Sequence, residues 1–149
     1  MRTVIQRVLN ASVTIDGVQT ATIGAGILCL IGISSHDAPK DRDQLIAKIL
    51  KLRIFEDEAG KMNKSVVDVG GEILLVSQFT LYGDCKKGNR PSFINAMPPA
   101  EAASFYQAFI ESFVAAYPQV KSGVFQADMK VALVNDGPVT IILDTEKQV

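Results

Sequence analysis

The sequence has little of what most catalytic centres depend on. It contains one histidine and two cysteines in 149 residues. A Ser-His-Asp or Cys-His arrangement needs a histidine beside its nucleophile, yet His36 lies in a polar loop far along the chain from Ser77, Thr80 and Cys85. Zinc-site spacing, a phosphate-loop motif and a dinucleotide-binding motif are also missing. The sequence therefore disfavours triad chemistry and a metal site, and we expect no cofactor.

An excess of charge of either sign is missing as well. Lys and Arg number 15 against 16 Asp and Glu, so no overall field draws the protein to nucleic acid or to an anionic membrane. Any RNA contact must then be local. The chain has neither an apolar run of about 18 residues nor the apolar region of a signal peptide after Met1. We expect a soluble, cytoplasmic protein without membrane contact.

The length fits one domain, residues 1–149, with a single core that needs no disulfide. The two cysteines form no CxxC pair. Cys29 lies in the apolar run 27–33 and is expected to be a buried thiol. Cys85 is expected to be an exposed, free thiol.

Alternating apolar and polar residues predict antiparallel strands at the start of the chain. Residues 3–9 and 12–15 alternate or nearly so, and Asp16-Gly17 is a strong hairpin signal that leads into residues 18–23. The continuous apolar run 27–33 suits a strand covered on both faces.

Two segments show the apolar period of amphipathic helices. The first starts at Asp41, and the second is introduced by Pro98-Pro99 and ended by Pro118. Further strands are predicted at residues 72–76, 120–125, 128–134 and 139–143. These elements predict an α+β domain, in which an antiparallel, barrel-like curved β-sheet carries two main helices.

The polar corner Asn135-Asp136-Gly137-Pro138 separates the last two apolar runs. Gly137 permits backbone angles that other residues avoid, whereas Pro138 has no N–H and makes a cis bond before it more accessible. Two interpretations are open. The corner is a hairpin turn that joins two strands and nothing else, or it presents bare carbonyl oxygens outward.

Residues 82–91 form a second loop, which contains Lys86, Lys87 and Arg90. No aromatic residues are interleaved with these cations. The pattern therefore fits a solvated loop as well as weak phosphate binding.

Two motifs closely resemble the signatures of D-aminoacyl-tRNA deacylases. They are Ser77-Gln78-Phe79-Thr80-Leu81, which follows an apolar strand, and Asn135-x-Gly137-Pro138-Val139-Thr140. The resemblance extends through residues 4–8, 11–13, 90–93 and 125–129. It implies a homodimer that hydrolyses the ester between a D-amino acid and the 3′-terminal adenosine of tRNA. It also implies a cis Gly137–Pro138 bond whose carbonyls reach into the partner subunit's pocket.

The same resemblance assigns the catalytic residues. Ser77, Gln78, Phe79 and Thr80 would line the pocket around the ester and the terminal ribose. The N–H groups of Phe79 and Thr80 would stabilise the oxyanion. Thr80 carries a hydroxyl that could act as nucleophile, but no neighbour in the sequence would activate it. We therefore expect water to be activated with help from the neighbouring ribose hydroxyl.

For chiral selection the resemblance points to Gly137 and Pro138, together with Asn135 of the same motif. Carbonyl oxygens only accept hydrogen bonds, so they would hold the substrate ammonium group and fill the space that an L side chain needs. Glycine has no side chain, so glycyl-tRNA is expected to be a second substrate.

The resemblance also assigns roles to three other residues, and each of them has a purely structural interpretation as an alternative. Arg7 would brace the corner if its strand face is the inner one, or it is a solvated side chain. Phe125 and Met129 would border the adenosine and amino-acid ends, or they are ordinary core residues. Two other functions also stay open: a non-catalytic nucleic-acid-binding module that uses Lys86, Lys87 and Arg90, and a structural β-domain.

Overall fold

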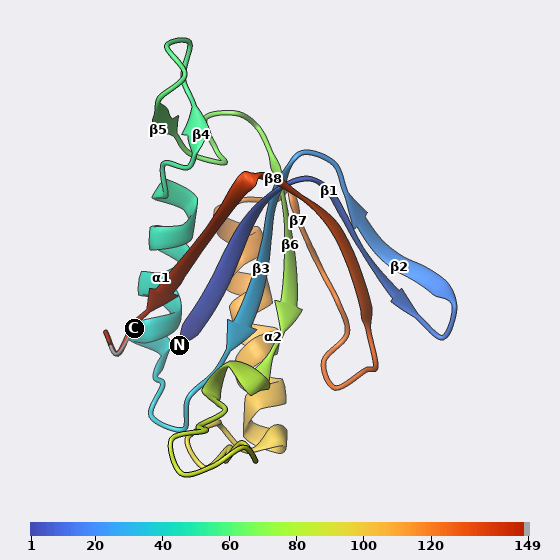
Figure 1. Ribbon diagram of the computed structural model, residues 1–149, viewed down its shortest axis with the longest axis vertical. Helices are drawn as coiled ribbons and strands as arrows, with labels where there is room; N and C mark the ends of the chain where they lie inside the picture. The colour runs from blue at the N-terminus through green and yellow to red at the C-terminus, as the bar shows by residue number, and fades with distance from the viewer. Residues whose placement is uncertain (148–149) are drawn as a thin grey trace.

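The computed structural model describes residues 1–147 and packs two helices against a strongly curved sheet (Figure 1). The strands of the sheet are β1 (Arg2–Ile15), β2 (Val18–Ile23), β3 (Gly26–Gly32), β6 (Glu72–Ser77), β7 (Val120–Ser122) and β8 (Lys130–Asp144). The other elements are α1 (Pro39–Lys51), α2 (Pro99–Ala116), the short 3-10 helix η1 (Phe79–Tyr82), and a hairpin of β4 (Phe55–Glu56) and β5 (Met62–Lys64). The predicted α+β architecture is confirmed.

The sheet is mixed, so its prediction as antiparallel is only partly right. The central strand β1 is antiparallel to β2, β3 and β8, but the pairs β3–β6 and β6–β7 are parallel. The connections explain this difference. The chain passes through α1 between β3 and β6 and through α2 between β6 and β7, and crossovers of this kind make neighbouring strands parallel.

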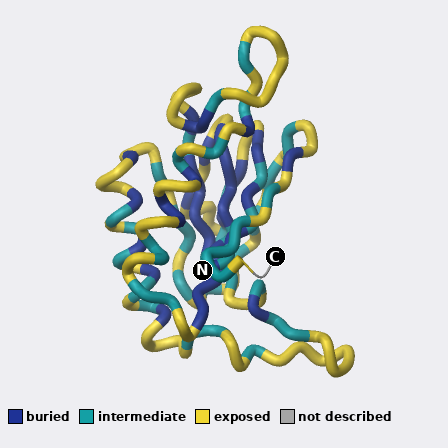
Figure 2. Tube along the Cα trace, turned by 90° about the vertical axis from the view of Figure 1, so that its left-hand side faces the viewer, coloured by how far each residue is buried: buried dark blue, intermediate teal, exposed yellow. Residues whose placement is uncertain are grey.

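Strand β3 is covered on both faces, as its continuous apolar run predicts. Cys29 and Ile31 belong to the larger apolar cluster, to which both helices contribute, whereas Leu28 belongs to a second cluster with β1 and β2. Figure 2 shows the buried strands at the centre and exposed loops around them. Cys29 is buried and Cys85 is exposed and free, as expected.

Both helices lie close to their predicted limits. Proline occupies the first turn of each, at Pro39 and Pro99, where its missing N–H costs no intrahelical hydrogen bond. The second helix ends at Ala116, before Pro118. None of the helices formed by residues 1–147 has the length and apolar character needed to cross a membrane.

The polar corner of residues 135–138, the Gly-Pro corner, does not join two separate strands, so the interpretation as a hairpin turn is wrong. The apolar runs on its two sides both pair with β1 and belong to one strand, β8. Gln6 pairs with Thr140 and Val8 with Asn135. Between these two pairs one residue of β1, Arg7, thus faces four of β8, and residues 136–139 leave the ladder as a wide bulge.

Candidate active site

A cleft of about 770 Å³ opens where β6 ends and η1 begins. It brings together five of the residues singled out in the sequence: Ser77, Gln78, Phe79, Phe125 and Met129. The first three enter from the end of β6, and the other two come from the segment between β7 and β8. Most of the lining is apolar, so the cleft suits a ligand with an apolar body and few polar groups.

The backbone at the end of β6 fixes the polar side of the cleft. The Gln78 N–H donates to the Ile31 carbonyl at 2.7 Å, and the Gln78 side-chain amide donates to Thr80 Oγ1 at 2.5 Å. Phe79 and Thr80 open η1, and the first N–H groups of a helix have no acceptor inside it. Thr80 is exposed beside the cleft and is not among the residues that line it.

Few groups in this region can take up a proton at neutral pH. Burial raises the pKa of both Tyr82 and Tyr106 well above the usual range, so both phenols stay protonated. The amide of Gln78 is not a base. Among the described residues that line the cleft, Asp128 alone has an ionisable side chain, and it is 85% exposed at the rim and paired with Lys130 at 3.0 Å.

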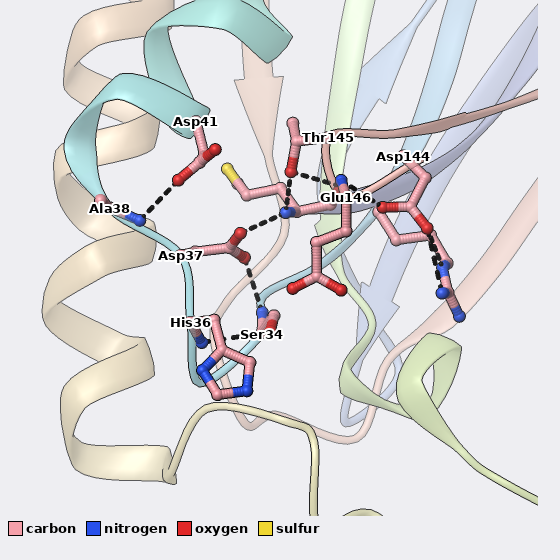
Figure 3. Close-up of polar contacts among 10 residues, drawn as sticks. Ser34, His36, Asp37, Ala38, Asp41, Asp144, Thr145 and Glu146 are labelled. Carbon is pink, nitrogen blue, oxygen red and sulfur yellow. Dashed lines mark hydrogen bonds and ion pairs between the residues drawn. The ribbon is translucent and has the colours of Figure 1, made fainter. Parts of the chain in front are cut away.

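Other chemistry finds little support in the arrangement. His36 lies in the exposed loop before α1, where its backbone N–H donates to Ser34 Oγ (Figure 3). Across residues 1–147, His, Cys, Asp and Glu side chains form no group of three that could hold a metal ion.

The Gly-Pro corner is braced by a buried arginine. Arg7 is only 7% exposed, which settles that its side chain faces inward. It donates to the Ile54 carbonyl at 2.8 Å, and its Nε lies 3.2 Å from Asp136 Oδ2. The Gly137–Pro138 peptide bond is cis, as the resemblance implies, and both residues are exposed.

Asn135 closes the base of the bulge. Its Nδ2 donates to the carbonyl oxygens of Arg7 and Val139, each at 3.0 Å. These two bonds satisfy backbone acceptors at the point where the bulge interrupts the ladder. In this chain Asn135 is therefore a residue that shapes the corner.

Replacing Asn135 with Asp is expected to lower the free energy of unfolding by about 2–3 kcal/mol. The substitution puts a carboxylate oxygen where Nδ2 donates, so two carbonyl oxygens lose their donor and face a negative charge. Asn135→Ala only removes the donor and is expected to cost less. Urea denaturation of the two variants tests this, and an Asp variant as stable as the unaltered protein would contradict it.

Within one chain the corner and the cleft lie apart. Along β3, Arg7 pairs with Ile27 and Ser77 with Ile31, and four residues of strand span about 13 Å. Neither Gly137 nor Pro138 lines the cleft. In Figure 1 the bend of β8 lies near the top of the sheet and η1 near its lower end. Arg7, Asn135, Gly137 and Pro138 thus form a second group, separate from the cleft residues.

Arg2 contacts η1 and was not singled out in the sequence. Its guanidinium donates to the Leu81 carbonyl at 2.9 Å, contacts Asp144 Oδ2 at 3.0 and 3.2 Å, and lies 4.8 Å from the centre of the Tyr82 ring. Leu81 lies 79 residues away in the sequence, and no local pattern signals such a contact. Arg2 therefore ties the helix that carries Phe79 and Thr80 to β8.

The neighbouring end of the sheet is held by a second polar group (Figure 3). Asp37 accepts hydrogen bonds from the Met1 amino group and, at 2.6 Å, from the Ser34 N–H. Burial raises the pKa of Asp37, and the Met1 amino group opposes that rise. Met1 also donates to Thr145 Oγ1 at 2.5 Å. These contacts tie Met1 to the loop before α1 and to Thr145, just after β8.

Arg2→Ala is expected to lower the free energy of unfolding by about 3 kcal/mol, because it leaves the fully buried Asp144 carboxylate without its cation. It should also speed amide hydrogen exchange at Leu81 and Tyr82, since η1 loses its tie to β8. Arg2→Lys keeps the charge and should lose less than half as much. Exchange rates in η1 that match those of the unaltered protein would contradict the role given to Arg2.

Comparison with known proteins gives concordant results. Residues 4–144 match the family model of D-Tyr-tRNA(Tyr) deacylase. Over 147 residues, which is 99% of both chains, the protein is 55% identical to the D-aminoacyl-tRNA deacylase of Desulfitobacterium hafniense (strain DSM 10664 / DCB-2). It is 53% identical, with the same coverage, to that of Clostridium botulinum (strain 657 / Type Ba4).

Two solved structures share the fold. The c-Myc DNA unwinding element binding protein is 49% identical, with a TM-score of 0.93 over 97% of this chain and 99% of that one. A probable eukaryotic D-amino acid tRNA deacylase superposes with a TM-score of 0.83 over 95% and 97% of the two chains, and at 18% identity it speaks for the fold alone. By its sequence over nearly the whole length, the chain belongs to the D-aminoacyl-tRNA deacylase family.

Proposed function

We propose that the protein hydrolyses the ester bond of D-aminoacyl-tRNA, releases the D-amino acid and the tRNA, and spares L-aminoacyl-tRNA. One observation carries this proposal beyond family membership. The signature segment Ser77–Phe79 and the segment 125–129, far apart in the sequence, line one cleft. A hydrolase of this substrate would work in the cytoplasm.

In the proposed reaction the protein mainly positions the ester. The N–H groups of Phe79 and Thr80, at the start of η1, would stabilise the oxyanion. Ser77 and Gln78 would hold the ribose and the ester, while Phe125 and Met129 contact the adenine and the amino-acid side chain. Thr80 already accepts a hydrogen bond from Gln78 and has no adjacent base. Water is then activated with help from the ribose hydroxyl next to the ester.

The chirality filter would come from a second subunit. The exposed Gly137 and Pro138 project from a bulge that has no partner in β1, about 13 Å along the sheet from the cleft of the same chain. Their carbonyl oxygens can therefore enter the cleft of a partner, where they would bind the substrate ammonium group and exclude an L side chain. Arg7 and Asn135 would hold these carbonyls in place.

The exposed surface around β8 supports a homodimer. Among the described strands, β8 pairs with β1 alone, so its other edge is open. Three large apolar side chains near it are about half exposed: Leu9 at 54%, Val134 at 47% and Ile142 at 54%. A two-fold symmetric partner would cover this surface and bring each corner toward the other subunit.

The direct test measures ester hydrolysis on D-tyrosyl-tRNA, L-tyrosyl-tRNA and glycyl-tRNA. The D ester should be cleaved at least ~10³-fold faster than the L ester, and the glycyl ester should also be cleaved because glycine passes a filter that acts on side chains. Equal inertness toward all three esters would remove the proposal.

A second candidate is nucleic-acid binding without catalysis. The relative of 49% identity is named for binding DNA, and the loop with Lys86, Lys87 and Arg90 offers the charges. This alternative predicts tight RNA binding that weakens steeply with salt and leaves D-aminoacyl esters intact. The same hydrolysis assay separates the two functions.

A further inference from the structure

Three cations, Lys86, Lys87 and Arg90, belong to a loop whose two ends lie at the cleft. The loop leaves η1 at Gly83 and returns to Phe93, which lines the cleft. Asp84 and Ser92 exchange two backbone hydrogen bonds, of 2.8 and 2.9 Å, and so tie the two ends together. Residues 85–90 therefore project as one unit, the basic loop, at the lower end of the molecule in Figure 1.

The salt bridges among residues 1–147 leave out the cations of the basic loop. Lys86, Lys87 and Arg90 are all exposed, and among residues 1–147 none of them takes part in a salt bridge. The chain as a whole carries a net charge of −1. Three positive charges within five residues are thus a local concentration of charge that the rest of the chain does not share. A bound polyanion would relieve their mutual repulsion.

Aromatic side chains that flank the basic loop in the sequence form an exposed surface at its base. Phe79 is 58% exposed, and its ring packs edge-on against that of Phe93 with the centroids 5.0 Å apart. The first ring precedes the basic loop and the second follows it. An exposed aromatic side chain beside cations is the combination with which proteins bind single-stranded nucleic acid.

We propose that the basic loop binds the backbone phosphates of the single-stranded 3′ end of tRNA, next to the terminal nucleoside in the cleft. This inference rests on the proposed function. It adds a binding site for the tRNA outside the cleft that holds the ester. A protein without excess positive charge can bind a polyanion only through such a local contact. The exposed ring of Phe79 would strengthen this contact, because a nucleotide base can stack on it.

The test compares two substrates that share the ester but differ in phosphates, D-tyrosyl-tRNA and 3′-O-(D-tyrosyl)adenosine. The variant is Lys86→Ala/Lys87→Ala/Arg90→Ala. The matched control is Lys48→Ala/Lys51→Ala/Lys61→Ala, which removes the same charge from exposed positions in the last turn of α1 and before β5. The β4–β5 hairpin lies at the end of the molecule opposite to the basic loop (Figure 1).

The loop variant should raise KM for D-tyrosyl-tRNA about tenfold and change kcat by less than about twofold, since it removes binding that is uniform along the reaction. The salt dependence of kcat/KM should become shallower by about two in log–log slope, because three phosphate contacts are lost. Hydrolysis of the adenosine ester should stay unchanged, and the control variant should behave like the unaltered protein.

An equal loss on both substrates, or no loss on tRNA, would overturn the inference. If the unaltered protein cleaves neither ester, the proposed function fails separately. The basic loop is then tested by fluorescence anisotropy with an uncharged acceptor-stem hairpin that ends in a single-stranded 3′ CCA. Binding at least tenfold weaker than that of the control variant supports the loop, and equal binding overturns it.

Discussion

Gly137→Ala is expected to reduce D-aminoacyl-tRNA hydrolysis by at least ~100-fold and the free energy of unfolding by about 2 kcal/mol. Gly137 has a φ of +121°, where an L side chain is strained, and an added Cβ would lie 2.9 Å from Val139 Cγ2 and 3.1 Å from Arg7 Nη2. Neither neighbour is free to move, since Val139 and Arg7 are both buried. The bulge must shift instead, and the carbonyls proposed to select the substrate shift with it.

Gly60→Ala is the matched control. Gly60 also has a positive φ, of +74°, but it lies between β4 and β5 and an added Cβ meets nothing within 4 Å. This variant should lose about 1 kcal/mol of stability and keep full activity. Values of kcat/KM on D-tyrosyl-tRNA and urea denaturation measure both effects. A Gly137→Ala variant as active as Gly60→Ala would contradict the role of the corner.

The second large effect concerns the substrate. Removing the ribose hydroxyl beside the ester is expected to slow hydrolysis by ~10²–10⁴-fold, the usual contribution of acid–base assistance. Thr80→Ala should stay within about tenfold of the unaltered rate, because the Thr80 hydroxyl lies outside the cleft lining and has an amide, which is not a base, as its partner. Single-turnover rates on D-tyrosyl-tRNA with a normal or deoxy terminal adenosine measure this.

Asp128→Asn is the control for a protein base. Its carboxylate is the one ionisable group in the described lining, but it is highly exposed and paired with Lys130. The rate should therefore change little. An inert Thr80→Ala or Asp128→Asn variant, together with normal hydrolysis of the deoxy substrate, would show that the protein and not the substrate activates the nucleophile.

Features that depend on local pattern could be predicted from the sequence. Prolines and the apolar period mark both helices, and the apolar run around Cys29 identifies a strand covered on both faces. Five residues of the cleft lining, from Ser77–Phe79 and 125–129, were singled out because their motifs resemble those of a known family. Their roles stay predictions.

Features that depend on pairing between strands far apart in the sequence could not be predicted. The parallel pairs of β6 arise from helical crossovers, whose direction no strand pattern records. The corner looks like a turn because turns and wide bulges use the same residues, and only the shared partner β1 distinguishes them. The tie from Arg2 to Leu81 likewise exists only after β1 and β8 have paired.

In the proposed dimer, the Gly-Pro corner of one subunit completes the cleft of the other. Mixing two inactive variants tests it most directly: Ala127→Trp, which fills the cleft, and Gly137→Ala, which displaces the corner. In a shared site, half of the randomly formed dimers contain one intact cleft facing one intact corner, so co-refolding should restore about a quarter of the native activity. A mixture that forms heterodimers yet stays inactive would contradict the shared site.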